Sequence, residues 1–147
     1  MKKSMDLKIL ESQIDGCAYF KWREALWLNS FGICAFPNSE KIVSNIIKTA
    51  QKMDELREFF GAPLFISSWY RPAKYNDMIG GAKKSQHVLG LAVDFTVKGL
   101  ISENARLMLK PNLEKFNIRC EALNTVHVHI DLNCVQDMPN DSRFFMP

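Results

Sequence analysis

Residues 38–60 carry apolar side chains at steps of three and four positions, with polar and charged residues between them. This spacing puts the apolar residues on one face of a helix, so the segment is predicted to be an amphipathic helix packed on a core. Asn38 or Ser39 can cap its start, and Gly61 can end it. The apolar positions are Ile42, Val43, Ile46, Ile47, Ala50, Met53, Leu56 and Phe60.

Three shorter helical segments are indicated elsewhere. They cover residues 20–30, residues 73–79, and a stretch that starts at a Ser102 cap and is interrupted at Pro111. In the first of them, Trp22, Leu26 and also Trp27 are expected to pack inward as core residues.

Four segments instead favour strands, because they are rich in β-branched and aromatic residues or alternate apolar with other side chains. They are residues 64–70 (LFISSWY), 91–97 (LAVDFTV), 117–123 (NIRCEAL) and 125–132 (TVHVHIDL). The last two are close enough in sequence to form a hairpin through Asn124. Helices separated in sequence from a small antiparallel sheet predict an α+β fold, with the helices packed on one side of the sheet.

The length and the hydrophobic content fit one domain. A chain of 147 residues, of which 47% are hydrophobic, is long enough to bury one core and too short for two. Within this single domain, 1–147, we distinguish a helical N-terminal part (about 1–60), a part that contains the candidate metal ligands (about 61–132) and a tail (133–147) that is expected to be irregular.

Charge is spread along the chain. The formal net charge is only +3, and the acidic and basic residues are interspersed, which argues against a nucleic-acid-binding protein. No stretch approaches the roughly 18 apolar residues of a membrane span, so no membrane partner is expected. The N-terminal stretch contains Asp6, Lys8, Glu11 and Asp15 where a secretory signal would be apolar, so we expect synthesis in the cytoplasm without a signal peptide. We also expect a monomer.

The four cysteines are widely spaced, and no C-x-x-C pair suggests a redox or zinc-finger motif. Without a predicted export signal, the thiols are expected to be reduced and mostly buried.

All three histidines of the chain, His87, His127 and His129, fall in two short segments that also contain acidic residues. On the strand 125–132 the side chains alternate, so Thr125, His127, His129 and Asp131 share one face, while the apolar residues between them share the other. One face of this strand is therefore predicted to be dry core, and the opposite face to hold possible metal ligands.

Asp94 and His87 are predicted to complete such a site. Alternation on the strand 91–97 puts Asp94 on the same face as the small Ala92, which leaves room for a metal ion. Gly90 lets the backbone turn sharply, so that His87 can fold back beside Asp94. Zinc accepts imidazole nitrogen and carboxylate oxygen, and three protein ligands with an open fourth position are typical of a catalytic zinc site.

A hydrolytic zinc site also needs a proton shuttle that is not itself a ligand. Glu121 is the first candidate, because it lies six residues before His127 and a tight hairpin could bring both to the same face. Asp131 is the alternative.

The run from Ser67 to Asp94 resembles the M15 family of zinc peptidases, which includes D-alanyl-D-alanine carboxypeptidases, D,D-dipeptidases and phage L-alanyl-D-glutamate endopeptidases. The family signature S-x-H-x-x-G-x-A-x-D is present as Ser85, His87, Gly90, Ala92 and Asp94. A segment upstream of this signature matches the S-x-Y-R-x-P-like segment of the family, with Arg71 in the position of its arginine. The later run VHVHIDL resembles the closing strand of the family. The resemblance covers roughly residues 60–132 and implies the fold shared by these peptidases and the hedgehog signalling domain.

The resemblance implies one zinc ion per chain, with His87 and Asp94 as the first two ligands. For the third ligand, some branches of the family would select His129 and others His127. His127 is preferred, because Glu121 then occupies the position of the catalytic glutamate. In that arrangement His129 lies beside the metal and stabilises the oxyanion.

The resemblance also implies a substrate site. Arg71 corresponds to the arginine that binds a substrate carboxylate or polarises the scissile carbonyl, a role that suits its planar guanidinium. Ser85 is expected to orient a ligand or the substrate. Tyr70 is a candidate for substrate binding, although Trp69 and Tyr70 alternate on their strand and at most one of them can face the cleft.

The expected function is therefore zinc-dependent hydrolysis of a peptide bond in the peptidoglycan stem peptide or cross-link. The enzyme would be a carboxypeptidase or an endopeptidase, for example a phage endolysin that reaches the cell wall by a phage-type release route. The alternative is a catalytically silent, zinc-containing module of the same fold that binds cell wall or protein, as in the hedgehog signalling domain.

Overall fold

The computed structural model describes residues 6–123, 126–134 and 136–147 and has an α+β fold, as the sequence predicted. Its helices are α1 (Trp22–Leu26), α2 (Glu40–Phe60), α3 (Ala73–Met78), α4 (Ser102–Leu109), α5 (Leu113–Phe116) and α6 (Asn140–Arg143), with 3₁₀ turns η1 (Ile9–Glu11), η2 (Gln86–Leu89) and η3 (Lys110–Asn112). Its strands are β1 (Trp27–Leu28), β2 (Ile33–Cys34), β3 (Leu64–Ser68), β4 (Ala92–Val97), β5 (Arg119–Glu121), β6 (Val128–Asp131) and β7 (Phe144–Phe145).

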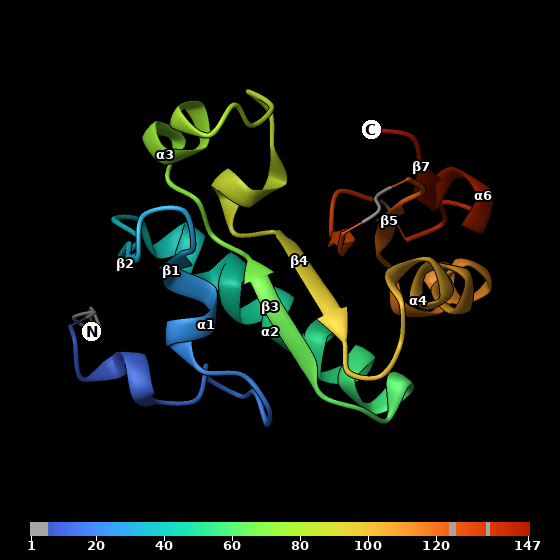
Figure 1. Cartoon of the computed structure of the whole chain (residues 1–147), viewed down its shortest axis with the longest axis horizontal. Helices are drawn as coiled ribbons and strands as arrows, with labels where there is room; N and C mark the ends of the chain where they lie inside the picture. Colours follow the sequence, from blue (N-terminus) through green and yellow to red (C-terminus); the bar gives the residue numbers. More distant parts are fainter. Residues whose placement is uncertain (1–5, 124–125, 135) are drawn as a thin grey trace.

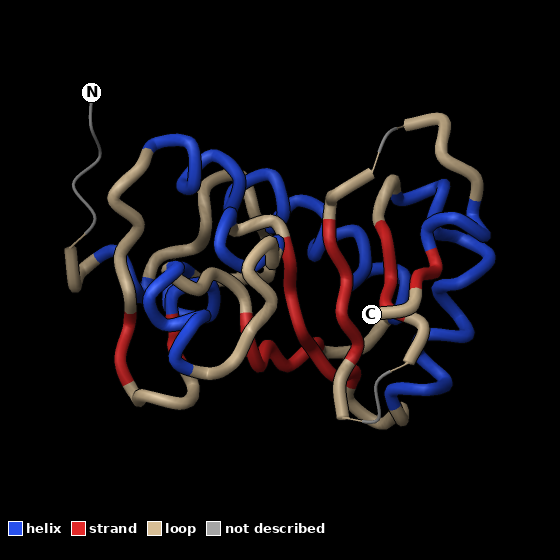
Figure 2. Tube along the Cα trace, turned by 90° about the horizontal axis from the view of Figure 1, so that it is seen from above, coloured by secondary structure: helices blue, strands red, loops and turns tan. Residues whose placement is uncertain are grey.

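The larger sheet has the strand order β3-β4-β6-β5-β7. Its first four strands are antiparallel to their neighbours, whereas β7 runs parallel to β5. Figure 2 shows these strands side by side in the middle of the molecule. The strands β1 and β2 form a separate antiparallel hairpin.

The long helix α2 confirms the prediction for residues 38–60. The Ser39 hydroxyl caps its first turn by accepting a hydrogen bond from the Lys41 backbone N–H at 3.2 Å, and Gly61 ends it in the left-handed conformation (φ 63°). Its buried face includes Ile46 and Met53, which belong to the same hydrophobic core as the sheet. In Figure 1, α2 runs behind β3 and β4.

The two faces of the sheet have different compositions. The face toward the helices carries apolar core residues, namely Val93, Phe95, Cys120, Val128 and Ile130. The opposite face carries polar and ionisable residues, namely Asp94, Arg119, Glu121, His129 and Asp131, as strand alternation requires. The helical layer therefore covers one face and leaves the other available for a site.

Helix α2 also fixes the turn that precedes β4. The Asn45 amide donates to the carbonyl of Leu89 at 2.9 Å, and the Thr49 hydroxyl lies 3.0 Å from the carbonyl of Gly90. Gly90 has a positive φ of 75°, and a Cβ added to it would lie 2.8 Å from Cγ1 of Ile46. Only glycine fits this close approach between helix and turn.

Replacing Gly90 by alanine is expected to destabilise the metal-free protein by more than the roughly 1–2 kcal/mol of a left-handed alanine, because the new methyl group also collides with Ile46. Gly99 provides the matched control, since its φ is 78° and a Cβ added there would meet nothing within 4 Å. Urea unfolding of both variants measures the difference. Equal losses of stability would contradict the role of the contact with α2.

Two predicted boundaries at the ends of the chain were wrong. The helix predicted for residues 20–30 ends at Leu26, because the chain there enters the hairpin β1–β2, and Trp27 is 38% exposed instead of packed in the core. The tail predicted to be irregular forms α6 and β7, and β7 completes the sheet.

Smaller differences concern caps and turns. The cap of α4 is Ile101, and the Ser102 hydroxyl donates instead to the carbonyl of Val126. The strands β5 and β6 pair in antiparallel fashion as expected, but Asn124, at the predicted turn, and Thr125 lie outside the described residues.

The cysteines are all free thiols, as predicted. Cys17 and Cys120 are buried, and Cys34 and Cys134 are half-buried. Within the described ranges, no helix is both long and apolar enough to cross a membrane.

Candidate metal centre

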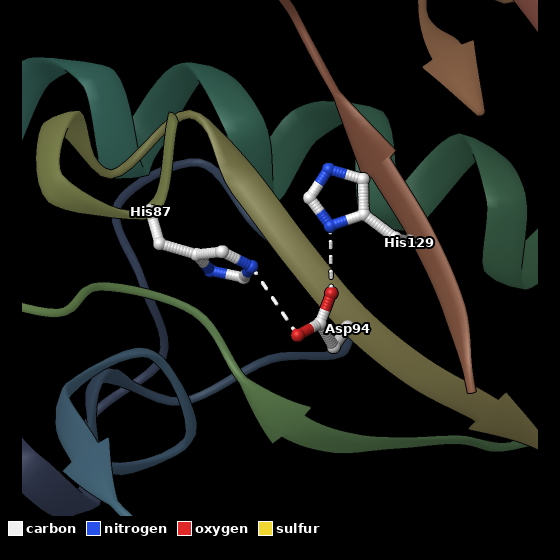
Figure 3. A group of neighbouring side chains, drawn as sticks. All are labelled: His87, Asp94 and His129. Atoms are coloured by element: carbon white, nitrogen blue, oxygen red, sulfur yellow. Dashed lines mark hydrogen bonds and ion pairs between the residues drawn. The ribbon is translucent and has the colours of Figure 1, made fainter. Parts of the chain in front are cut away.

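Three potential ligands meet on the polar face of the sheet. His87 comes from η2, Asp94 from β4 and His129 from β6, and Figure 3 shows both imidazoles reaching toward the carboxylate from two sides. One donor atom from each residue lies within 4.8 Å of the other two. The register of the sheet contributes to this arrangement, because β4 and β6 pair Asp94 directly with His129.

His87 is fixed in one orientation by its surroundings. The Ser85 hydroxyl caps η2 by accepting from the His87 backbone N–H at 3.2 Å. Nδ1 of the ring lies 2.7 Å from the carbonyl oxygen of Trp69, which can only accept, so Nδ1 carries the proton and donates it. Burial lowers the pKa of His87 below its ordinary value, although Asp94 opposes this shift. Nε2 is therefore the ring nitrogen that can bind a metal ion once it carries no proton.

This nitrogen faces the carboxylate of Asp94. Nε2 of His87 lies 3.2 Å from Oδ2 of Asp94. A lone pair and a carboxylate oxygen at this distance repel each other unless a cation lies between them. Neutral imidazole nitrogen and carboxylate oxygen are also the donor types that zinc prefers, so these residues fit a zinc ion.

His129 is held between two carboxylates. Its Nδ1 lies 2.8 Å from Oδ1 of Asp94, and its Nε2 lies 3.2 Å from Oδ2 of Asp131. Burial would lower the pKa of His129, but the hydrogen bonds to Asp131 and Asp94 outweigh it and raise the pKa to about 9. Asp131 in turn accepts two hydrogen bonds from the guanidinium of Arg119, at 2.8 and 2.9 Å. A carboxylate on the outer ring nitrogen is the usual support of a metal-binding histidine.

Asp94 is surrounded by the three imidazoles. Besides its contacts with His87 and His129, its Oδ2 lies 3.4 Å from Nε2 of His127. Burial alone would raise the pKa of Asp94, but hydrogen bonds from His129 and His87 hold that pKa well below its usual range. The carboxylate is therefore ionised and available as a ligand.

The structure thus brings all the predicted ligands together around Asp94. Within the described residues, the side chains whose donor atoms lie within 4.8 Å of one another are His87, Asp94 and His129, and we call them the donor set. His129 is the alternative third ligand of the sequence analysis. His127 borders this set through its contact with Asp94, and its side chain is partly exposed.

Glu121 lies on the same face of the sheet as the histidines. The pairs Arg119–Asp131 and Cys120–Ile130 set the register of β5 and β6, which places Glu121 opposite His129. Glu121 and His127 line one cavity, as the hairpin prediction requires. The alternative shuttle, Asp131, lines the same cavity but is 1% exposed and bound to Arg119, and its carboxylate also contacts Nε2 of His129.

Arg71 borders the same site. Its Nε is buried and has no hydrogen-bond partner within the described part of the chain, and its side chain lines the cavity beside Asp94. Burial lowers the pKa of the Arg71 guanidinium, and the negative charge of Asp94 partly offsets this shift. A half-buried cation with an unused donor is suited to an incoming carboxylate.

The two neighbouring aromatic residues do not contribute side chains to this site. Trp69 and Tyr70 are 0% and 4% exposed, and both belong to the hydrophobic core. Tyr70, the predicted substrate-binding residue, therefore lies inside the core, and burial raises the pKa of its phenol. Trp69 acts on the site through its backbone carbonyl.

Two residues near the site were missed by the sequence analysis. Arg119 supports Asp131, and Phe145 of β7 packs against Arg119 and His129, since its ring centre lies 4.0 Å from the Arg119 guanidinium and 6.1 Å from the His129 ring. The alternation of β5 could have placed Arg119 on the polar face. Nothing in the local sequence points to Phe145, because its position depends on the pairing of β7 with β5.

Two cavities meet at Arg71, Asp94 and His127, and together they form one cleft across the metal centre. We call the first cavity the aromatic half; its lining includes Trp27, Asn29, Ser30, Phe31, Ser68 and Tyr75. We call the second the ionic half; its lining includes Lys84, Ser85, Arg119, Glu121, His129 and Phe145.

The family model for peptidase M15 matches residues 24–131, a range that contains the donor set, Arg71, Glu121 and His127. The matched range ends with β6, so Phe145 lies outside it. No curated protein matches the chain.

Proposed function

The chain belongs to the peptidase M15 family, and from this premise we propose that it is a zinc-dependent peptidase that hydrolyses a peptide bond in the stem peptide or cross-link of peptidoglycan. The observation that carries the proposal is the donor set of His87, Asp94 and His129, in which Nε2 of His87 lies 3.2 Å from a carboxylate oxygen of Asp94.

In this proposal, Nε2 of His87, the carboxylate of Asp94 and Nδ1 of His129 hold one zinc ion per chain. A bound zinc ion polarises a carbonyl group and lowers the pKa of a water molecule to near neutrality. The protein contributes rigidity: the Trp69 carbonyl fixes the ring of His87, and Asp131 fixes the ring of His129. Such supporting hydrogen bonds orient the ligands and raise their basicity.

Proton transfer is assigned to Glu121. Its carboxylate lies opposite His129 and lines the ionic half, where it can take a proton from the attacking water and give it to the leaving amine. Arg71 holds a carboxylate of the peptide or polarises the scissile carbonyl. His127, beside Asp94, is placed to stabilise the negative charge that develops on the carbonyl oxygen.

The experiment that tests this function is digestion of purified peptidoglycan by the zinc-loaded protein, with mass analysis of the released fragments. We expect soluble peptide fragments whose masses correspond to cleavage of one amide bond, and no fragments after removal of the metal with a chelator. Binding to peptidoglycan without release of any fragment would overturn the peptidase and favour the silent binding module.

The two neighbouring histidines are expected to differ in zinc retention. His129→Ala should lose zinc, because the donor set loses a ligand, whereas His127→Ala should keep zinc at saturating metal. Loss of a group outside the ligand set typically costs only about 10- to 100-fold in affinity or activity. Metal analysis of both variants at increasing zinc concentration measures the difference. The reverse pattern would make His127 the third ligand, as the sequence suggested.

A further inference from the structure

The aromatic half of the cleft is built for an uncharged group. Three aromatic rings, Trp27, Phe31 and Tyr75, line it together with the amide of Asn29 and several serine hydroxyls. Apart from the three residues that it shares with the ionic half, the phenol of Tyr75 is the only ionisable group that the described residues contribute to its lining. A charged part of a substrate would find no opposite charge on these side chains.

The wall formed by these rings is held in place before a ligand arrives. The hairpin pairs Trp27 with Cys34, and the backbone N–H of Gly32 donates to the carbonyl of Leu28 at 2.9 Å, which closes the turn. Phe31 packs edge-on against Tyr75 of α3, with ring centres 4.9 Å apart. This contact joins the hairpin to α3 across the aromatic half, and preformed pockets of this kind bind ligands without a large ordering cost.

The mixture of rings and neutral hydrogen-bonding groups distinguishes between possible ligands. A purely apolar side chain would leave the amide of Asn29 and the hydroxyls of Ser30 and Ser68 without partners, which is unfavourable once water is excluded. A sugar ring offers C–H faces that pack on aromatic rings and hydroxyl or acetamido groups at its edge. The lining matches both features of a sugar ring.

The ionic half lies on the other side of the metal centre. It contains the cations Lys84 and Arg119, and Arg71 borders both halves. Since the donor atom of Asp94 lies where the halves meet, a bound substrate extends in both directions from the bond that is cut. The carboxylate of a peptide can pair with Lys84 or Arg71 in the ionic half, and an uncharged sugar fits the aromatic half.

We propose, on the basis of the function proposed above, that the aromatic half binds the N-acetylated amino sugar that carries the stem peptide, with Trp27 as the stacking platform. The bond that is hydrolysed is then an internal one close to the glycan strand, and the enzyme is an endopeptidase. Trp27, Phe31 and Tyr75 determine specificity for the sugar.

The first test compares two substrates of the zinc-loaded full chain: a stem peptide attached to its amino sugar, and the same peptide without the sugar. We expect kcat/KM to be about 10-fold higher with the sugar, the ratio that one stacked ring and one hydrogen bond would give. Trp27→Ala should bring this ratio close to one. Phe65→Ala is the matched control, because Phe65 is also exposed but lies outside the cleft lining, and it should keep the ratio of the unchanged protein.

The second test uses binding alone. Of the three tryptophans, Trp22 and Trp69 are fully buried, whereas Trp27 is 38% exposed, so a ligand in the aromatic half should change the fluorescence of Trp27 selectively. The ligand is the free amino sugar, with its acid group blocked as an amide. Titration with this ligand is expected to shift the tryptophan fluorescence emission of the unchanged protein. The shift should be absent in Trp27→Phe.

The outcomes separate this inference from the proposed function. If both peptides are cleaved equally well and the sugar causes no shift, the sugar site is refuted while the peptidase stands. If the sugar causes the shift but neither peptide is cleaved, the sugar site stands and the peptidase is refuted. Release of only the C-terminal residue of the stem would overturn the internal cleavage.

Discussion

Replacing Asp94 by asparagine is expected to reduce the zinc content from about one ion per chain to nearly none and to abolish hydrolysis. Asp94 is the only carboxylate of the donor set, and three imidazoles lie within hydrogen-bonding or ion-pairing distance of it. The loss of zinc affinity should exceed the roughly 10- to 100-fold that follows loss of a supporting group. Metal analysis of the purified variant and titration with zinc measure the effect.

Asp77→Asn is the matched control for this variant, because Asp77 is an exposed carboxylate on α3 that lies outside the metal centre. It should bind zinc with unchanged affinity. Full zinc occupancy in Asp94→Asn would show that the metal site is elsewhere, and the assignment of His87 and His129 would then also be lost.

Replacing Glu121 by glutamine is expected to leave zinc content and fold intact while hydrolysis falls by about 10²- to 10⁴-fold, the range for removal of a general acid–base group. In terms of the activation barrier this is roughly 3 to 5 kcal/mol. Glutamine keeps the size of the side chain but cannot accept the proton. The measurement is kcat/KM on a stem peptide at saturating zinc.

Glu103→Gln, an exposed position on α4, serves as the control for the loss of one negative charge and should be fully active. An undiminished rate in Glu121→Gln would remove Glu121 from the mechanism. Asp131, the alternative shuttle, would then be the next residue to test, because it lines the same cavity.

Elements with a strong local pattern were predictable from the sequence. Helix α2 has a regular apolar face, a serine cap and a terminal glycine, so its start and end follow from interactions within the segment itself. The alternation of β6 likewise identified its polar face, because a strand packed on one side must alternate.

Elements that depend on distant partners were not predictable in this way. The strand β7 has only two residues and exists because β5 offers its free edge to Phe144 and Phe145. The short strand β1 interrupts the expected helix because Trp27 pairs with Cys34. Neither pairing leaves a periodic signal in its own segment.

The third metal ligand shows the same limit at the level of the site. Alternation places His127 and His129 on one face and cannot distinguish them. The proposal of His129 rests instead on the register between β4 and β6, which sets His129 directly opposite Asp94, and on the buried pair of Asp131 and Arg119 that supports its ring. Register is a property of the assembled sheet.

The attachment of the His87 turn to α2 limits how the chain can be divided or transplanted. A fragment that begins after α2 would keep every proposed ligand, yet it would lose Asn45 and Thr49, whose side chains bind the carbonyls of Leu89 and Gly90. It would also expose the core face of the sheet to water. For protein engineering, the smallest transferable unit therefore includes the helix, and the motif from Ser85 to Asp94 grafted alone onto another scaffold would need a substitute for these two donors.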